Sequence, residues 1–182
     1  MSGLDQRIVL APTDGSLGPL LRIADDRLPA GAGYGAHDHH DVDVVAVVLA
    51  GSLRHSWGEG DRFGAGDVAV LRAGSGLTHD EVAGDDGARV LQCYLRGAEP
   101  AAPPSHEVHR AADGWVDLRR PDARLWVGRA RPGEDVVVPA GLLVVRGVDG
   151  VVVERQDGGP VGGPGVLLVW QLDAGRPAWA EW

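Results

Sequence analysis

Around residue 38 the sequence reads Gly31-Ala32-Gly33-Tyr34-Gly35-Ala36-His37-Asp38-His39, in which a single residue separates two histidines. Side chains at positions i and i+2 point to the same face where the backbone is extended. The segment His79-Asp80-Glu81 repeats this spacing with a histidine and a glutamate about forty residues later. Two such segments on neighbouring strands would combine three imidazoles and one carboxylate in a single pocket.

The residue types in this pattern indicate a metal site. Neutral imidazole and carboxylate suit borderline and hard divalent cations. Four ligands from one face leave one or two coordination positions open for water, dioxygen or a chelating substrate. We therefore interpret His37, His39, His79 and Glu81 as ligands of a divalent metal ion rather than as isolated surface or structural residues.

Other polar residues near this pattern receive weaker interpretations. Asp43 shares the ligand face if its strand is unbroken, so it either binds the metal or accepts an N–H from a ligand histidine, and we favour the second role. His40 points to the opposite face, where we expect it to be solvated. His55 either lines the cavity or has a structural role between strands. His106 and His109 show no partner pattern, and the sequence assigns them no role.

The distribution of glycine and proline predicts an all-β fold. There are 28 glycines and 12 prolines, and they interrupt the chain often enough to leave short valine- and leucine-rich runs without helical periodicity. The segments 49–53 and 63–67 look like tight turns in which glycine supplies a positive φ. The expected strands are residues 6–10, 20–28, 42–49, 52–57, 67–72, 79–82, 90–95, 125–130, 135–139, 142–146, 151–155 and 166–172.

A proline-rich stretch divides the sequence into two halves of different chemistry. Residues 97–105 contain three prolines, and all seven histidines lie at or before His109. We therefore expect an N-terminal metal-binding unit over residues 1–98. A second β unit without a metal site is expected over residues 106–182.

Composition excludes several classes of function. The formal net charge of −9, without a stripe of arginines, argues against nucleic acid as a partner. No apolar run is long enough to span a bilayer, and the first residues lack the features of a signal peptide. The single cysteine, Cys93, cannot form an internal disulfide. We expect a cytoplasmic protein that does not bind membranes and that is a monomer.

The motifs resemble those of the cupin superfamily, and most closely those of its pirin branch. The run from Gly31 to His39, with Asp43 and Leu49-Ala50-Gly51 after it, is similar to the first cupin motif. The runs Gly66-Asp67-Val68 and Ala73-Gly74-Ser75-Gly76-Leu77-Thr78-His79-Asp80-Glu81 are similar to the second. The spacing agrees from His37 to Glu81, and the resemblance covers residues 18–106. Departures from the pirin pattern include Asp38 for proline, Asp43 for glutamate and Asp80 for serine.

The resemblance implies a bicupin of two antiparallel β-barrel or jelly-roll units, the second one degenerate. It also implies one metal ion, most often iron, held by His37, His39, His79 and Glu81. We expect Fe(II), with Ni, Mn, Co, Cu or Zn as alternatives. The implied activity is that of a quercetin 2,3-dioxygenase, with a flavonol-like substrate, dioxygen, and Glu81 as both ligand and base. The alternative is a non-catalytic metal-binding regulator or redox sensor; an isomerase or a sugar-binding cupin fits the ligand pattern less well.

Overall fold

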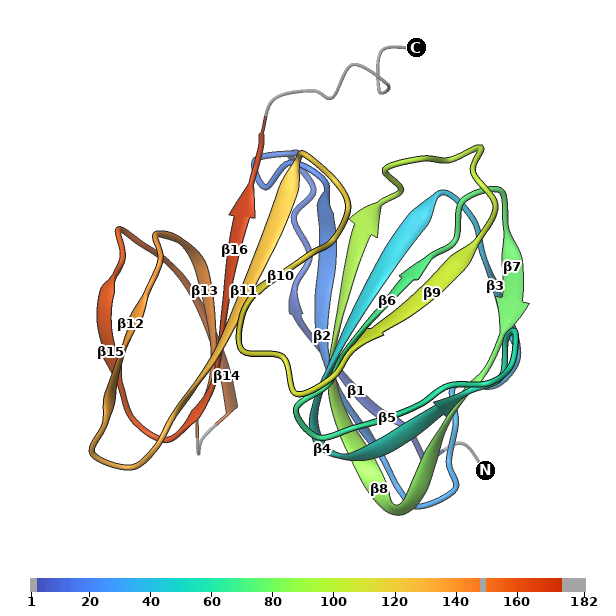
Figure 1. The fold of residues 1–182 in the computed structure, drawn as a ribbon, viewed down its shortest axis with the longest axis horizontal. Helices are drawn as coiled ribbons and strands as arrows, with labels where there is room; N and C mark the ends of the chain where they lie inside the picture. The colour runs from blue at the N-terminus through green and yellow to red at the C-terminus, as the bar shows by residue number, and fades with distance from the viewer. Residues whose placement is uncertain (1–2, 148–149, 175–182) are drawn as a thin grey trace. The chain divides into compact units, whose positions relative to one another are not determined.

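The fold is shown in Figure 1, in a computed structural model that describes residues 3–147 and 150–174. The chain divides into two compact units. The first comprises residues 1–11 and 21–111, and the second comprises residues 12–20 and 112–182. The described residues form strands and contain no helix. No helix long and apolar enough to cross a membrane is therefore found among them.

The first unit is built on a seven-stranded sheet in the order β1-β2-β8-β4-β6-β9, with β5 paired to β4, and on a separate two-stranded sheet of β3 and β7. The strand bounds are β1 Asp5–Leu10, β2 Leu20–Leu28, β3 His37–His39, β4 Val42–His55, β5 Arg62–Gly64, β6 Val68–Arg72, β7 Leu77–His79, β8 Glu81–Arg96 and β9 Ser105–His109. The pairs β1–β2, β4–β8, β4–β6 and β6–β9 are antiparallel.

The long strands β4 and β8 form the centre of this unit. β4 runs through the predicted turn at residues 49–53, and that prediction was wrong. Gly51 does have the expected positive φ of 67°, but it lies at an irregularity in the β4–β8 register, where Gly51 faces Ala88 and Leu53 faces Ala83. A bulge of this kind bends a strand without ending it. The second predicted turn is present, since the amide of Asp67 donates to the carbonyl of Gly64.

Apolar side chains of β4, β5 and β8 pack into the core of the first unit. Leu53 and Phe63 are completely buried, and Val90 lies in the same cluster. A smaller cluster of Val44, Leu71, Ala73 and Leu77 lies against Trp57 and Tyr94. Cys93, the single cysteine of the sequence, is buried.

The second unit contains a five-stranded sheet in the order β10-β11-β16-β13-β14 and a two-stranded sheet of β12 and β15. The bounds are β10 Gly114–Val116, β11 Ala123–Ala130, β12 Asp135–Val138, β13 Gly141–Gly147, β14 Gly150–Gln156, β15 Gly159–Gly162 and β16 Gly165–Leu172. Leu143, Leu167 and Val169 are buried between them. All-β architecture, predicted from the glycine and proline pattern, is confirmed.

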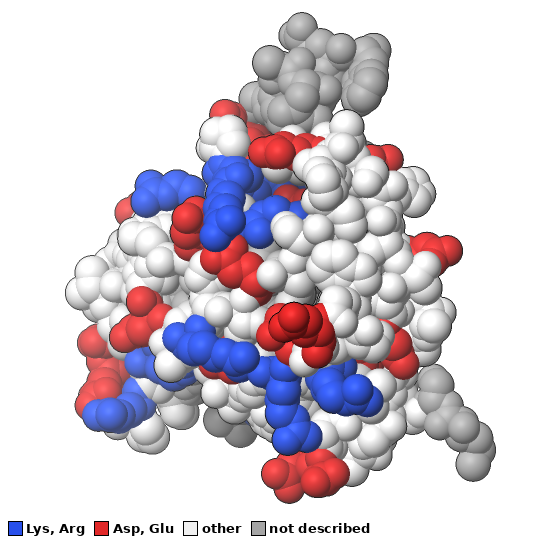
Figure 2. Space-filling view, turned by 45° about the vertical axis from the view of Figure 1, so that its right-hand side comes forward, with Lys and Arg blue, Asp and Glu red and all other residues white. Residues whose placement is uncertain are grey.

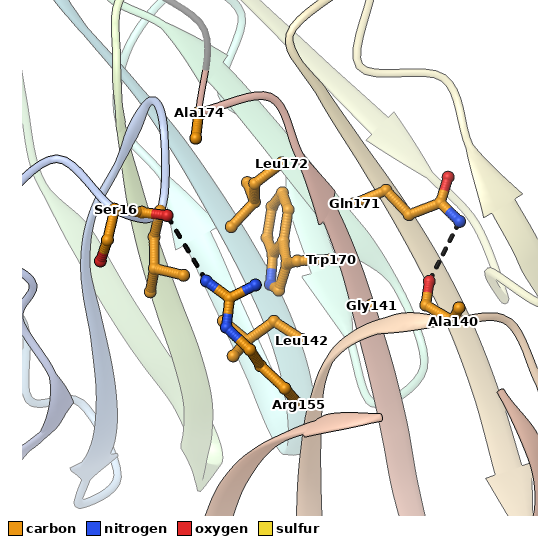
Figure 3. A pocket seen from close by; sticks show the side chains of 10 residues that line it. Ser16, Ala140, Gly141, Leu142, Arg155, Trp170, Gln171, Leu172 and Ala174 are labelled. Atoms are coloured by element: carbon orange, nitrogen blue, oxygen red, sulfur yellow. Dashed lines mark hydrogen bonds between the residues drawn. The ribbon is translucent and has the colours of Figure 1, made fainter. Parts of the chain in front are cut away.

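A cavity of about 320 Å³ opens in the second unit (Figure 3). It is lined by Ser16, Leu17, Ala140, Gly141, Leu142, Arg155, Trp170, Gln171, Leu172 and Ala174. Arg155 donates to the carbonyl of Ser16, and Gln171 donates to the carbonyl of Ala140. The lining includes no histidine and no carboxylate, so this cavity offers none of the ligand types of the predicted metal site.

Arginine side chains lie among carboxylates on the face shown in Figure 2. In the structure as a whole several arginines form ion pairs, including Arg72 with Glu107 at 3.5 Å and Arg110 with Asp67 at 2.9 Å. Arginines paired in this way carry less net positive potential toward a phosphate backbone. The exclusion of nucleic acid as a partner stays a prediction.

The bulge at Gly51 can be tested by substitution. A Cβ at Gly51 would overlap the carbonyl oxygen of Gly87, whereas a Cβ at Gly31, with a similar φ of 69°, would meet nothing within 4 Å. We expect Gly51→Ala to lower the free energy of unfolding by more than about 2 kcal/mol. Gly31→Ala should lower it by only about 1 kcal/mol, from backbone strain alone. Urea denaturation followed by circular dichroism measures both, and equal losses would contradict the bulge.

Candidate metal centre

The candidate metal centre is organised by the short antiparallel pair of β3 and β7. In this pair His37 lies opposite His79, Asp38 lies opposite Thr78, and His39 lies opposite Leu77. The Thr78 hydroxyl donates to the Asp38 carboxylate across the two strands. Directly opposed residues have their Cβ atoms close together on one face of an antiparallel pair. His37 and His79 are therefore brought face to face although 42 residues separate them in sequence.

Three imidazoles converge at this position. The Nε2 atom of His37 lies 3.0 Å from Nε2 of His39 and 3.1 Å from Nε2 of His79. The three rings have centroids 4.5 to 5.0 Å apart. Their ligand atoms form one of two groups among the described residues that are close enough to hold a metal ion. The structure thus brings the three histidines together, and their role as metal ligands stays a prediction.

The donor chemistry of this cluster fits a cation. The Nδ1 atom of His37 lies 2.7 Å from the Gly35 carbonyl and must donate its proton there, so Nε2 of a neutral His37 is a lone pair. Two other ring nitrogens approach that single lone pair. One hydrogen bond can satisfy only one of these approaches, whereas a cation between the three nitrogens interacts favourably with all of them.

Glu81 occupies a different part of the same region. Its carboxylate groups with His55 and His79, rather than with His37 and His39, among the sets of converging ligand atoms. Oε2 accepts a hydrogen bond of 2.9 Å from Gln92 Nε2. Gln92 also donates to the Tyr34 hydroxyl, which itself donates to the buried carboxylate of Asp26. Gln92 thus fixes one oxygen of Glu81 and leaves Oε1 without a hydrogen-bond partner among the residues described.

Burial keeps the candidate ligands in particular protonation states. Desolvation, with the neighbouring imidazoles, lowers the pKa of His79 to about 3 and that of His39 to about 4. Both rings are therefore neutral near pH 7, as metal ligation requires. Burial raises the pKa of Glu81 to about 7, against the opposing effect of the Gln92 hydrogen bond. A cation beside this carboxylate would favour its charged form.

The members of the cluster differ in burial. His37 and His39 are half-buried on β3, whereas His79 and Glu81 are buried. The ring of Tyr34 lies 6.4 Å from that of His37, and the ring of Tyr94 lies 5.8 Å from that of His39. The two histidines of β3 are thus the more exposed members of the cluster and have aromatic side chains as neighbours.

The remaining polar residues are placed as follows. Asp43 is buried in β4 opposite Arg72 and belongs to neither group of converging ligand atoms, so its predicted hydrogen bond to a ligand histidine stays a prediction. His40 is exposed beside Asp41. His55 is completely buried and contacts His79.

His106, to which the sequence assigned no role, stacks on His55. The pairing of β9 with β6 brings it there. No spacing in the sequence indicates this contact, because it depends on a long-range strand pairing.

The sequence is similar to a known protein family and to several of its curated relatives. Residues 12–95 match the profile of the family described as Pirin. The quercetin 2,3-dioxygenase of Escherichia coli K12 is 32% identical over 108 residues, which cover 56% of this chain and 47% of that protein. The chain therefore spans about half the length of this curated relative. A pirin-like protein of Caulobacter vibrioides is 26% identical over 89% of this chain and 82% of its own length.

Solved structures share the fold at low sequence identity. GK1651 from Geobacillus kaustophilus is 19% identical, covers 96% of this chain and 92% of its own, and has a TM-score of 0.74. Bacterial pirin YhhW from Escherichia coli, solved in complex with nickel(II), is 20% identical, covers 93% of this chain and 92% of its own, and has a TM-score of 0.72. The predicted resemblance to pirin-like bicupins is confirmed, and so is the predicted bicupin architecture.

Substitution can test whether the converging histidines bind a metal ion and the neighbouring His40 does not. We expect His37→Ala to weaken binding of Zn(II) or Ni(II) at least about 100-fold, because one of three nitrogen donors is lost. His40→Ala is the matched control, since His40 lies on the same segment but is exposed and outside the cluster. The metal affinity of His40→Ala, measured by isothermal titration calorimetry, should equal that of the wild type. Equal affinity of all three proteins would mean that the histidines do not bind the metal.

Proposed function

Because residues 12–95 form a pirin-family domain of the cupin superfamily, we propose that this chain binds one divalent metal ion and is a metal-dependent dioxygenase of the quercetin 2,3-dioxygenase type. The observation that carries the proposal is the convergence of the Nε2 atoms of His37, His39 and His79. Glu81 is proposed as the fourth ligand. The carboxylate offers Oε1 for this purpose, because Oε2 is held by Gln92.

The proposed substrate is a flavonol or another molecule with adjacent oxygen atoms in an enediol-like arrangement. A divalent metal ion at these ligands would act as a Lewis acid toward such oxygens and would supply the redox chemistry for reaction with dioxygen. Tyr34 and Tyr94 lie beside the half-buried histidines and provide aromatic surfaces against which a planar ring can pack. The β3 side of the cluster would admit the substrate.

Glu81 is proposed to take the hydroxyl proton of the substrate. The carboxylate is buried, so water does not strongly stabilise its charged form against accepting a proton. Gln92 donates to Oε2 and holds the side chain in place, and a carboxylate oxygen of Glu81 lies with the ligand atoms of His55 and His79. In this proposal Glu81 is both a ligand and the base.

Fe(II) is the metal we propose, although one solved pirin with this fold holds nickel(II). The test is metal analysis of protein purified without added metal, followed by oxygen-uptake measurements with flavonols after loading with Fe(II) or Ni(II). Oxygen consumption that depends on metal and flavonol supports the dioxygenase. Stoichiometric metal without oxygen uptake, combined with reversible cycling of bound iron between Fe(II) and Fe(III), would instead support a metal-binding regulator.

Glu81→Gln tests the role of the carboxylate. The substitution keeps the size and one oxygen donor but removes the charge, so it should weaken metal binding only moderately. Reloaded with saturating metal, this variant should still bind flavonol and should consume oxygen at least about 100-fold more slowly, because the base is lost. His79→Ala should instead lose the metal itself. If Glu81→Gln turns over at the wild-type rate, Glu81 is not the base.

A further inference from the structure

The second ring nitrogen of His79 faces another histidine rather than solvent or a carbonyl. The Nδ1 atom of His79 lies 2.6 Å from Nε2 of His55. We propose that His55, held in turn by His106 and Asp61, is a positioning residue that orients His79 and fixes which of its nitrogens is offered to the metal. This inference rests on the proposed metal centre.

The strands bring these residues together from distant parts of the chain. His55 is the last residue of β4 and lies opposite Glu81 in β8. His106 is in β9, which pairs with β6. Asp61 lies just before β5, and its carbonyl accepts a hydrogen bond from the amide of His55 at 2.8 Å. Four separate segments thus converge behind His79, on the side away from His37.

The contact between His79 and His55 couples the tautomers of the two rings. A neutral His79 offers Nε2 as a ligand only if its proton is on Nδ1. That proton then donates to Nε2 of His55, and the proton of His55 must be on its own Nδ1. In the opposite arrangement His79 carries a proton on Nε2, which points toward the other imidazoles and blocks the ligand position. His55 therefore acts on the metal through the orientation and protonation of His79, without touching the metal.

His106 and Asp61 hold the His55 ring in the required plane. The rings of His55 and His106 are stacked, with centroids 4.2 Å apart and an interplanar angle of 4°. Nδ1 of His106 lies 2.9 Å from Oδ2 of Asp61, which anchors the stacked ring from the far side. His55 is completely buried, and its Nδ1, which carries the proton in this arrangement, has no hydrogen-bond partner among the described residues. Its neighbours therefore decide its orientation.

Ordinary core packing is the competing explanation for a buried histidine at this position. It predicts that substitutions at residue 55 change stability only, and that an apolar side chain is at least as good as a polar one. The positioning role predicts that a hydrogen-bond acceptor is required. Two variants distinguish these explanations. His55→Gln can still accept through its amide oxygen, whereas His55→Leu fills a similar space without any acceptor.

The readout is affinity for Zn(II) measured by calorimetry, alongside the melting temperature of each metal-free protein. We expect His55→Leu to bind Zn(II) about 10–100-fold more weakly, the range for residues that support a ligand histidine. His55→Gln should stay within about threefold of the wild type. His106→Phe, which keeps the stack but loses the bond to Asp61, should fall between the two. Wild-type affinity in folded His55→Leu would overturn the proposal.

A second measurement needs no variant. In the zinc-loaded wild-type protein, long-range proton–nitrogen NMR spectra assign the tautomers of both rings. We expect a proton on Nδ1 of His79 and none on Nε2 of His55. A proton on Nε2 of His55 would overturn the proposal even if His55→Leu did not fold. If the wild type binds no Zn(II), Ni(II) or Fe(II), the proposed metal centre fails and this inference fails with it. If it binds and the spectra are reversed, only this inference fails.

Discussion

The candidate site depends on the pairing of two three-residue strands, β3 and β7. Their register sets His37 opposite His79 and, with a side-chain period of two, places His39 on the same face. A shift of β3 by one residue would turn His37 and His39 to the other face, away from His79. So short a pair has few hydrogen bonds of its own, and its neighbours must hold it. Gly33 bridges to Val82, and the amide of Asp41 donates to the carbonyl of Gly74. The relative positions of the three imidazole nitrogens therefore depend on the turns that flank both strands.

The large sheet contributes the environment rather than the ligands. β4 and β8 bury His55, His79 and Glu81, and this burial keeps the histidines neutral while it raises the pKa of the carboxyl group. Burying a carboxylate is costly unless it is hydrogen-bonded. A hydrogen bond from Gln92 stabilises the buried carboxylate of Glu81. Two hydrogen bonds from Arg89 stabilise that of Asp25 on the neighbouring β2. Burial thus leaves neutral imidazole nitrogens that can donate to a cation, and a bound cation would favour the charged form of Glu81.

Much of the site could be predicted because its spacing is local. The i, i+2 pairs in His37-Asp38-His39 and His79-Asp80-Glu81 express the strand period directly, and the glycines around them mark the turns. What the sequence did not show depends on long-range pairing. Nothing near His106 indicates that β9 would pair with β6 and stack its ring on His55. Nor does the sequence show that residues 12–20 group with the second unit. Gly51 was misread because a positive φ serves a turn and a strand bulge equally well.

The placement of Glu81 refines the simple picture of four equivalent ligands. Its carboxylate lies with His79 and His55, whereas the three Nε2 atoms converge with His37 at their centre. His79 is the residue common to both groups, so it links the imidazoles to the carboxylate. The orientation of this one ring then controls whether nitrogen and oxygen donors can face the same ion. That orientation is set through Nδ1 by His55, which makes the residues behind the site as important to its geometry as those that line it.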